Sequence, residues 1–180
     1  MEHISTFPLP PVTLVLGGAR SGKSRYAETV VMGSPPPWIY IATAEPFDDE
    51  MRARIGEHKS RRGEQWQTVD APTDLAGAIE DAPRDRTVLV DCLTLWLSNL
   101  MHAEADLDEA TDELVMALDG YGAPVVFVSN EVGLGLVPET PLGRAFRDAQ
   151  GRLNMRMAER ADRVILMAAG LPLLMKDRPT

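Results

Sequence analysis

Residues 17–24, GGARSGKS, constrain the fold more than any other stretch of this chain. A glycine, four further residues and then Gly-Lys-Ser is the spacing of a loop whose backbone amides bind nucleotide phosphates. An apolar, β-branched run at 12–17 precedes the loop, and a helix-forming stretch at 23–32 follows it. The strand–loop–helix order that such a loop requires is therefore complete, and the sequence predicts a nucleotide-binding α/β fold.

The residue types within this loop suit separate tasks. Gly17, Gly18 and Gly22 allow backbone amides to approach phosphate oxygens without obstruction by side chains. We expect Lys23 to reach the outer phosphates of the nucleotide and the Ser24 hydroxyl to bind Mg²⁺.

Strands and helices alternate along the rest of the chain. Apolar runs predict further strands, at 38–43, 86–93, 123–130 and 163–168, with 171–176 as a partner for the last of them. Helices are expected at 49–63, 73–82, 107–119 and 142–161. Continuously apolar strands are typical of a sheet covered on both faces. We therefore expect a single-domain P-loop nucleotide-binding fold of the α/β class, with a mostly parallel central sheet and helices on both faces. The proline-containing residues 1–11 are expected to form a flexible tail before a domain at 12–180.

Composition excludes several classes of partner. The net charge of the 180 residues is -9, which argues against nucleic acid or an anionic membrane as the main partner, because both require a basic surface. A single cysteine excludes an intramolecular disulfide and favours a reducing compartment. No apolar run has the length of a membrane span, and no signal peptide is visible at the N-terminus, so we expect a cytoplasmic protein.

Asp91 is the candidate for the second magnesium-binding group. It closes the apolar run VLVD, and P-loop proteins place an acidic residue at the end of a neighbouring strand. The alternative is that Asp91 caps a following helix. Cys92 beside it is expected to pack in the core, because no cluster of charges nearby would lower its pKa.

His58 has two interpretations. It follows Met51 and Ile55 on one face of the expected helix at 49–63, and Lys59 and two arginines come directly after it. Cations disfavour protonation of an imidazole and attract phosphate oxygens, so His58 could attack phosphorus. The alternative is an ordinary surface histidine, the interpretation that His3 and His102 also receive.

Four stretches together resemble one enzyme family. They are GGARSGKSRYAE, YIATAEPFDDEMRARIGEHKSRR, VDCLTLWLSNL and SNEVGLGLVPETPLGRAFRDAQGRLNMR, in this order between residues 12 and 176. They are similar to the bifunctional adenosylcobinamide kinase / adenosylcobinamide-phosphate guanylyltransferase family. The resemblance implies that the histidine which carries GMP covalently is His58. It implies nucleotide contacts at Gly17, Gly18, Ala19, Arg20, Ser21, Gly22, Lys23, Ser24, Thr43, Ala44, Glu45, Lys59, Ser60, Arg61, Arg62, Asp70 and Asp91.

The same resemblance implies two reactions on one substrate. In the first, ATP or GTP phosphorylates the hydroxyl of the aminopropanol arm of adenosylcobinamide. In the second, GMP passes from GTP to that phosphate, giving adenosylcobinamide-GDP and pyrophosphate. Mg²⁺ is the implied cofactor, and a homotrimer is the implied assembly.

The residues leave some questions open. Arg20 either contacts phosphate or faces solvent, and the loop at 131–141 either binds a ligand or only links a strand to a helix. A monofunctional small-molecule kinase with an incidental His58 is a second candidate. A GTP-dependent switch is disfavoured, because the stretch at 129–132 is SNEV and lacks the Lys and Asp of an Asn-Lys-x-Asp guanine motif.

Overall fold

A seven-stranded sheet forms the centre of the computed structural model, which describes residues 9–45 and 63–178. In chain order the strands are β1 (Val12–Gly17), β2 (Trp38–Ala42), β3 (Trp66–Asp70), β4 (Val88–Asp91), β5 (Val125–Asn130), β6 (Arg163–Ala168) and β7 (Leu171–Asp177). Their order in the sheet is β3-β2-β4-β5-β1-β6-β7. All neighbouring pairs are parallel except β6 and β7, which form an antiparallel hairpin.

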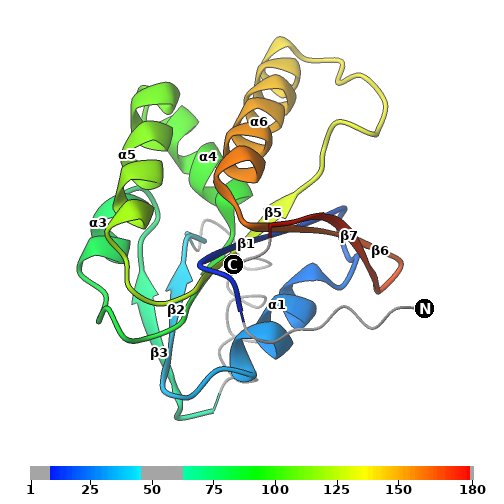
Figure 1. The fold of residues 1–180 in the computed structure, drawn as a ribbon. Coiled ribbons are helices and arrows are strands. Elements are labelled where there is room, and N and C mark those ends of the chain that lie inside the picture. Colours follow the sequence, from blue (N-terminus) through cyan, green and yellow to red (C-terminus); the bar gives the residue numbers. More distant parts are fainter. Residues whose placement is uncertain (1–8, 46–62, 179–180) are drawn as a thin grey trace.

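Helices cover both faces of this sheet (Figure 1). The described helices are α1 (Lys23–Met32), α3 (Leu75–Glu80), α4 (Leu93–His102), α5 (Leu107–Asp119) and α6 (Pro141–Arg160). Successive residues of a strand point to opposite faces, so Leu14 joins the core cluster under α3 to α6, whereas Val15 joins the cluster under α1. The expected α/β fold, with a mostly parallel sheet between two helical layers, is confirmed.

Two elements were not predicted from the sequence. Strand β3 is an edge strand whose residues are exposed or only half-buried, so it lacks the apolar run that identifies the central strands. Helix α4 directly follows β4, and its apolar residues extend the apolar run of that strand. His102 is the last residue of α4 and is exposed, which agrees with its interpretation as an ordinary surface histidine.

Other predictions fall at the ends of the described chain or outside it. The helix expected at 49–63 lies outside the described residues, apart from Gly63. At the N-terminus, Leu9 is half-buried against the cluster under α1 and Pro10 is buried, so packing on the domain begins before β1. Of the helices in the described ranges, none combines the length and the apolar character that crossing a membrane requires.

Candidate nucleotide-binding site

The predicted site residues lie together at the carboxyl ends of the parallel strands, which we call the sheet edge of the site, as distinct from the outer strands β3 and β7. Gly17 lies opposite Asn130 of β5, and Ala42 lies opposite both Asp70 of β3 and Asp91 of β4. Ligands of open α/β sheets bind in the crevice outside the carboxyl ends of the strands. The loop at 17–24 and the two acidic residues therefore share the edge at which this fold binds ligands.

The phosphate loop leads directly into the start of α1. Gly22 is the N-cap residue at φ 93, a left-handed conformation that favours glycine. No side chain caps the helix and its first turn holds no acidic residue. The N–H groups of the first turn of a helix and the positive end of the helix dipole together attract an anion. The Lys23 ammonium donates to the carbonyl of Gly18 at 3.1 Å, so it lies across the loop.

The loop packs tightly on the turn between β6 and β7. The N–H of Gly170 donates to the carbonyl of Ser21 at 3.0 Å. A Cβ at Gly17 would lie 2.5 Å from Ser21 Oγ and 2.7 Å from the carbonyl oxygen of Met167. Real Cβ atoms do not approach other atoms so closely, so Gly17 is required where the loop leaves β1.

Asp91 does not cap the helix that follows it. The N-cap residue of α4 is Cys92, and no side chain caps that helix. The Asp91 carboxylate instead accepts a hydrogen bond from the hydroxyl of Tyr40 at 3.2 Å and remains half-buried at the edge of the sheet. The structure therefore rules out the capping alternative for Asp91.

The donor atoms at this edge fit Mg²⁺. Ser24 offers a hydroxyl and Asp91 a carboxylate, and Mg²⁺ prefers such oxygen ligands. Among residues 9–45 and 63–178 there is no group of three or more His, Cys, Asp or Glu side chains that could enclose a metal ion. In nucleotide enzymes the protein supplies one or two ligands to Mg²⁺, and the phosphates and water supply the rest.

Comparison with known proteins identifies the family. The family described as cobinamide kinase / cobinamide phosphate guanyltransferase matches residues 13–175 of this chain. The chain belongs to this family. Its members are enzymes of cobalamin biosynthesis with a kinase and a guanylyltransferase activity.

Curated relatives match almost from end to end. The bifunctional adenosylcobalamin biosynthesis protein CobP of Pseudomonas aeruginosa is 44% identical over 169 residues, which cover 92% of this chain and 98% of the relative. The bifunctional adenosylcobalamin biosynthesis protein CobU of Salmonella typhimurium is 41% identical over 179 residues, which cover 91% of this chain and 98% of the relative. The alignment therefore includes nearly all of the relatives' length.

Solved structures support the fold. The ATPase EscN of the enteropathogenic Escherichia coli type III secretion system has a TM-score of 0.58 and 13% identity, covering 88% of this chain and 43% of that chain. The flagellar accessory protein FlaH of Methanocaldococcus jannaschii has a TM-score of 0.54 and 10% identity, covering 93% of this chain and 78% of that chain. At these identities the likeness concerns the fold alone.

The side chain of Thr43, at which the sequence resemblance implies a nucleotide contact, forms its hydrogen bonds within the protein. It is 0% exposed. Its hydroxyl donates to the carbonyl of Cys92 at 2.7 Å and accepts from the N–H of Cys92 at 2.8 Å. Asn99 on α4 donates to the carbonyls of both Thr43 and Pro72, at 2.8 and 2.9 Å. These bonds tie the end of β2 to the end of β4, so the Thr43 hydroxyl positions the sheet edge.

Cys92 is an inert core residue of this family member. Its side chain packs in the cluster under α1. Burial first, and the neighbouring Asp91 carboxylate second, raise the pKa of the thiol to about 11, although hydrogen bonds from the backbone of Leu95 and Thr94 and the Lys23 cation act in the opposite direction. At neutral pH the thiol is therefore protonated and a poor nucleophile.

The remaining predicted residues are half-buried, exposed or outside the described ranges. Ala44 and Glu45 are half-buried directly after β2, Asp70 is exposed at the end of β3, and Arg20 is exposed at φ 57. The following predicted residues lie outside the described ranges: His58, Lys59, Ser60, Arg61 and Arg62.

A buried polar network under α6 was missed at the sequence level. The Ser129 hydroxyl donates to Asn154 Oδ1 at 2.7 Å, and Gln150 Nε2 donates to the same oxygen at 3.0 Å. Asn154 Nδ2 then donates to the carbonyl of Asn130 at 3.0 Å. The signal in the sequence is the pair Gln150 and Asn154, four residues apart on the apolar stripe of α6. The network attaches α6 to the carboxyl end of β5, where the loop at 131–140 begins.

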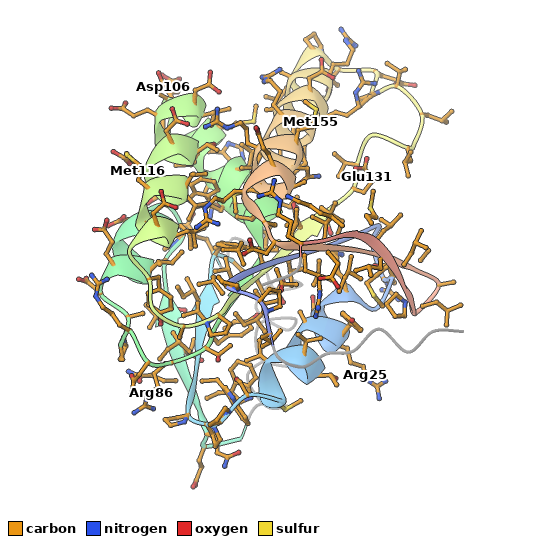
Figure 2. All side chains as sticks on the ribbon, viewed as in Figure 1. Arg25, Arg86, Asp106, Met116, Glu131 and Met155 are labelled. Carbon is orange, nitrogen blue, oxygen red and sulfur yellow. The ribbon has the colours of Figure 1, made fainter. Side chains whose placement is uncertain are left out.

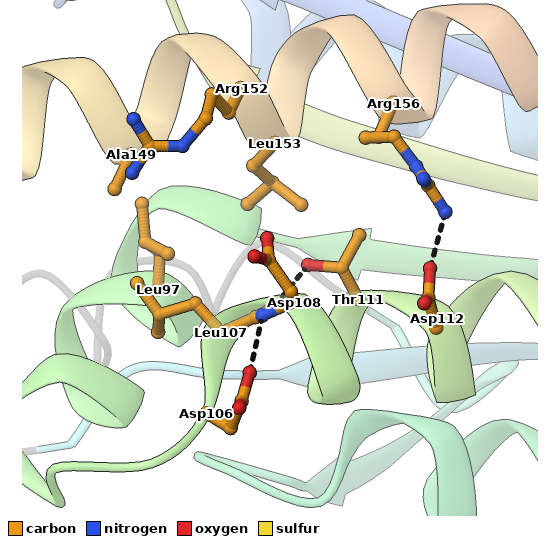
Figure 3. A pocket seen from close by; sticks show the side chains of 10 residues that line it. All are labelled: Leu97, Asp106, Leu107, Asp108, Thr111, Asp112, Ala149, Arg152, Leu153 and Arg156. Atoms are coloured by element: carbon orange, nitrogen blue, oxygen red, sulfur yellow. Dashed lines mark hydrogen bonds and ion pairs between the residues drawn. The ribbon is translucent and has the colours of Figure 1, made fainter.

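The pocket between α5 and α6 is separate from the nucleotide site (Figure 3). Its lining is strongly charged, with Asp106, Asp108 and Arg152, and Arg156 forms an ion pair with Asp112 across it. No residue of the phosphate loop or of a strand lines it. It lies among the helices on one face of the sheet, away from the edge where the phosphates would bind.

Proposed function

We propose that this protein phosphorylates adenosylcobinamide with ATP or GTP and then transfers GMP from GTP to adenosylcobinamide phosphate. The products are adenosylcobinamide-GDP and pyrophosphate. The observation that carries the proposal is that the phosphate loop and Asp91 lie at the carboxyl ends of strands in the same sheet. Residues 13–175 of this chain match the family. The curated relatives are named as bifunctional adenosylcobalamin biosynthesis proteins, which supports a chain with both activities.

The kinase step depends on the loop and the sheet edge. The amides at the start of α1 and the Lys23 ammonium bind the phosphate oxygens and neutralise charge that develops during transfer. The hydroxyl oxygen of the aminopropanol arm attacks the γ-phosphorus, and the nucleoside diphosphate leaves. Ser24 and Asp91 would hold Mg²⁺, which supplies positive charge to the phosphates.

The guanylyl transfer step is proposed to pass through His58. A nitrogen of its imidazole attacks the α-phosphorus of GTP, and the bond to pyrophosphate breaks. A phosphate oxygen of adenosylcobinamide phosphate then attacks the phosphorus of the GMP adduct and releases the imidazole. The support for His58 is its match to the family's histidine motif and the cations that follow it in the sequence.

The proposed assembly is a homotrimer. Its support in the structure is the apolar surface of β7 at the edge of the sheet, where Leu171, Leu173 and Met175 are about 60% exposed. An exposed apolar edge strand favours association with another chain. The number of three subunits comes from the family resemblance, and for a trimer light scattering should give a mass close to three times 19.7 kDa.

The test uses wild-type protein and the His58→Ala variant. Each is incubated with adenosylcobinamide, Mg²⁺ and GTP, and the products are analysed by mass spectrometry. Wild type should yield adenosylcobinamide-GDP, and His58→Ala should stop at adenosylcobinamide phosphate, because only the second step uses the imidazole. Wild type with GTP and Mg²⁺ alone should gain the mass of one GMP, in a linkage that acid cleaves and base does not.

Two results would contradict parts of this proposal. A His58→Ala protein that still gains GMP would place the nucleophile at another residue. Wild type that forms only adenosylcobinamide phosphate would be the monofunctional kinase that the sequence left open.

A further inference from the structure

A groove beside α6 begins where the phosphate loop begins. It has a volume of about 530 Å³, and Leu16 of β1 and Glu131 after β5 are among the residues that line it. Leu16 directly precedes Gly17, and the N–H of Glu131 donates to the carbonyl of Gly17 at 3.1 Å. We call this the α6 groove, with Leu16, Glu131, Arg147, Arg152, Met155 and Ala158 as its defining residues.

Position distinguishes this groove from the two other pockets described. The pocket between α5 and α6, and another among α3, α4 and α5, have no lining residue from β1 or from the phosphate loop. An acceptor hydroxyl must come within about 3–3.5 Å of the phosphorus that it attacks. Of these three pockets, only the α6 groove has a wall residue adjacent in sequence to the loop that holds the phosphates.

The lining of the groove suits a large ligand with an apolar body and a polar rim. Leu16, Met155 and Ala158 contribute apolar surface. The polar groups of the lining include Arg152, Glu131, which accepts from the N–H of Gly133 at 2.6 Å, and an ion pair of Arg147 with Asp148 at 3.0 Å. Ligand sites typically combine apolar walls with a few polar groups that set orientation. A corrin ring with peripheral amide side chains has this chemistry, because its macrocycle is apolar and its amides form hydrogen bonds.

The loop at 131–140 adds apolar surface next to the groove. Gly133 of this loop lines the groove, and Leu134 and Leu136 one and three residues later are 86% and 97% exposed. Such exposure of apolar side chains close to a ligand site marks an interaction surface. Strand β1 leads to the groove and strand β5 leads to the loop. The two strands pair with each other, and the polar network under α6 holds the end of β5.

We propose that the α6 groove binds the corrin ring of cobinamide and directs the aminopropanol arm toward the phosphate loop. This inference rests on the proposed function and names the acceptor site for it. The loop at 131–140 then has a binding role, the first of the two alternatives left open by the sequence.

The test compares two methionines that resemble each other in all but position. Met155 on α6 is 67% exposed and lines the groove, whereas Met116 on α5 is 63% exposed and lines none of the three pockets (Figure 2). Met155→Arg places a long charged side chain in the groove, and Met116→Arg makes the same change elsewhere. Both positions are exposed, so neither change should disturb the core, which melting temperatures will verify.

Three measurements are made on wild type and both variants. They are the KM for adenosylcobinamide in the kinase reaction, the Kd of a fluorescent GTP analogue, and the gain of GMP from GTP without cobinamide. Met155→Arg should raise the KM by about tenfold or more, a loss that corresponds to removing part of a binding surface. Its Kd for nucleotide and its gain of GMP should match wild type, and Met116→Arg should match wild type in all three.

Each contrary outcome has a distinct meaning. A KM for Met155→Arg within about twofold of wild type, which is a difference below about 0.5 kcal/mol, would overturn the assignment of the groove and leave the proposed function standing. Weaker nucleotide binding in Met155→Arg would also overturn it, because the groove would then belong to the nucleotide site. A wild-type protein that neither phosphorylates adenosylcobinamide nor binds it in equilibrium dialysis would overturn the proposed function and this inference together.

Discussion

Lys23 is the residue on which both proposed reactions depend. Lys23 is the first residue of α1, and its ammonium lies across the phosphate loop. Lys23→Ala should lower both activities by about 10²–10³ in kcat, as removal of a single stabilising group does at other active sites. Rates of adenosylcobinamide phosphate and adenosylcobinamide-GDP formation provide the measurement.

Arg25 provides the matched control for Lys23. It is an exposed cation two residues further along α1, and Arg25→Ala removes the same charge without altering the loop. Both rates should then stay near those of wild type. Loss of only one activity in Lys23→Ala would show that the loop serves a single step.

Cys92 should be unreactive in the folded protein. Because burial and the Asp91 carboxylate raise the pKa of the thiol from 9.0 to about 11, only about one thiol in a hundred is ionised at pH 9 in the folded chain. Iodoacetamide at pH 7–9 should therefore label the native protein slowly and the urea-unfolded protein rapidly. Fast stoichiometric labelling of the native protein would contradict the burial of Cys92.

The same shift in pKa has a consequence for stability. The thiol remains protonated in the folded chain at a pH where the unfolded chain has already lost the proton. Its contribution to stability is therefore complete below pH 9 and is lost as the pH rises from 9 toward 11. Urea titrations across this range would measure the loss.

Single residues of the site differ in how visible they are in the sequence. Lys23 and Ser24 are visible because their spacing from Gly17 is local, and Asp91 is visible because it ends an apolar run. The bonds between Thr43, Cys92 and Asn99 join residues about 50 positions apart, so no local pattern contains them. The role of the Thr43 hydroxyl emerges only when β2 and β4 are placed side by side.

At the scale of elements, the packing of Gly17, where the phosphate loop begins, against β6 can be tested with two adjacent glycines. A Cβ at Gly17 would overlap Ser21 Oγ and the carbonyl of Met167, whereas a Cβ at Gly18 meets nothing within 4 Å. Gly17→Ala should reduce the free energy of unfolding by about 1–3 kcal/mol, as overpacked sites do. Its melting temperature should then fall by roughly 3–10 °C.

Gly18→Ala is the control for this prediction at the element scale. With open space around the new methyl group, its free energy of unfolding should stay within about 0.5 kcal/mol of wild type. Equal melting temperatures for the two variants would mean that Gly17 is not packed against Ser21 and β6 as described.

The elements themselves were predictable where periodicity was strong. Helix α6 carries Leu153 and Met157 at the spacing of one helical face, and the central strands are continuous apolar runs. Strand β3 was missed because an edge strand needs no apolar run, and its pairing with β2 depends on backbone hydrogen bonds that any sequence can make. Helix α4 was missed because it follows the buried strand β4 in the sequence and is itself buried. A buried helix and a buried strand are both apolar, so apolar character alone does not separate them.

At the scale of the whole molecule, the fold follows from the doubly covered sheet, but the position of the corrin site does not follow from the sequence. Parallel strands with apolar residues on both sides require helices on both faces, and that requirement determines the layers. The α6 groove instead requires Leu16 of β1 to meet Glu131 and α6, which lie more than 100 residues later in the chain. The order of strands and helices in the sequence predicts the layers of the fold. The position of the groove next to the phosphate loop depends on the pairing of β1 with β5, which the sequence does not show.

The N-terminal segment gives the last test, through two truncations with different starting points. Residues 1–8 contain no apolar periodicity, so removing them should leave the melting temperature and both activities near those of wild type. Removing residues 1–11 also deletes Leu9 and Pro10, which pack on the domain, and the carbonyl of Pro11, which accepts from the N–H of Val125 at 2.9 Å. The longer truncation should lose about 1–3 kcal/mol, because a buried donor on β5 then lacks its partner. If the contacts of residues 9–11 stabilise the domain, the longer truncation must not melt like wild type, and the shorter one must not lose stability by that amount. Either of those results would contradict a stabilising role for these contacts.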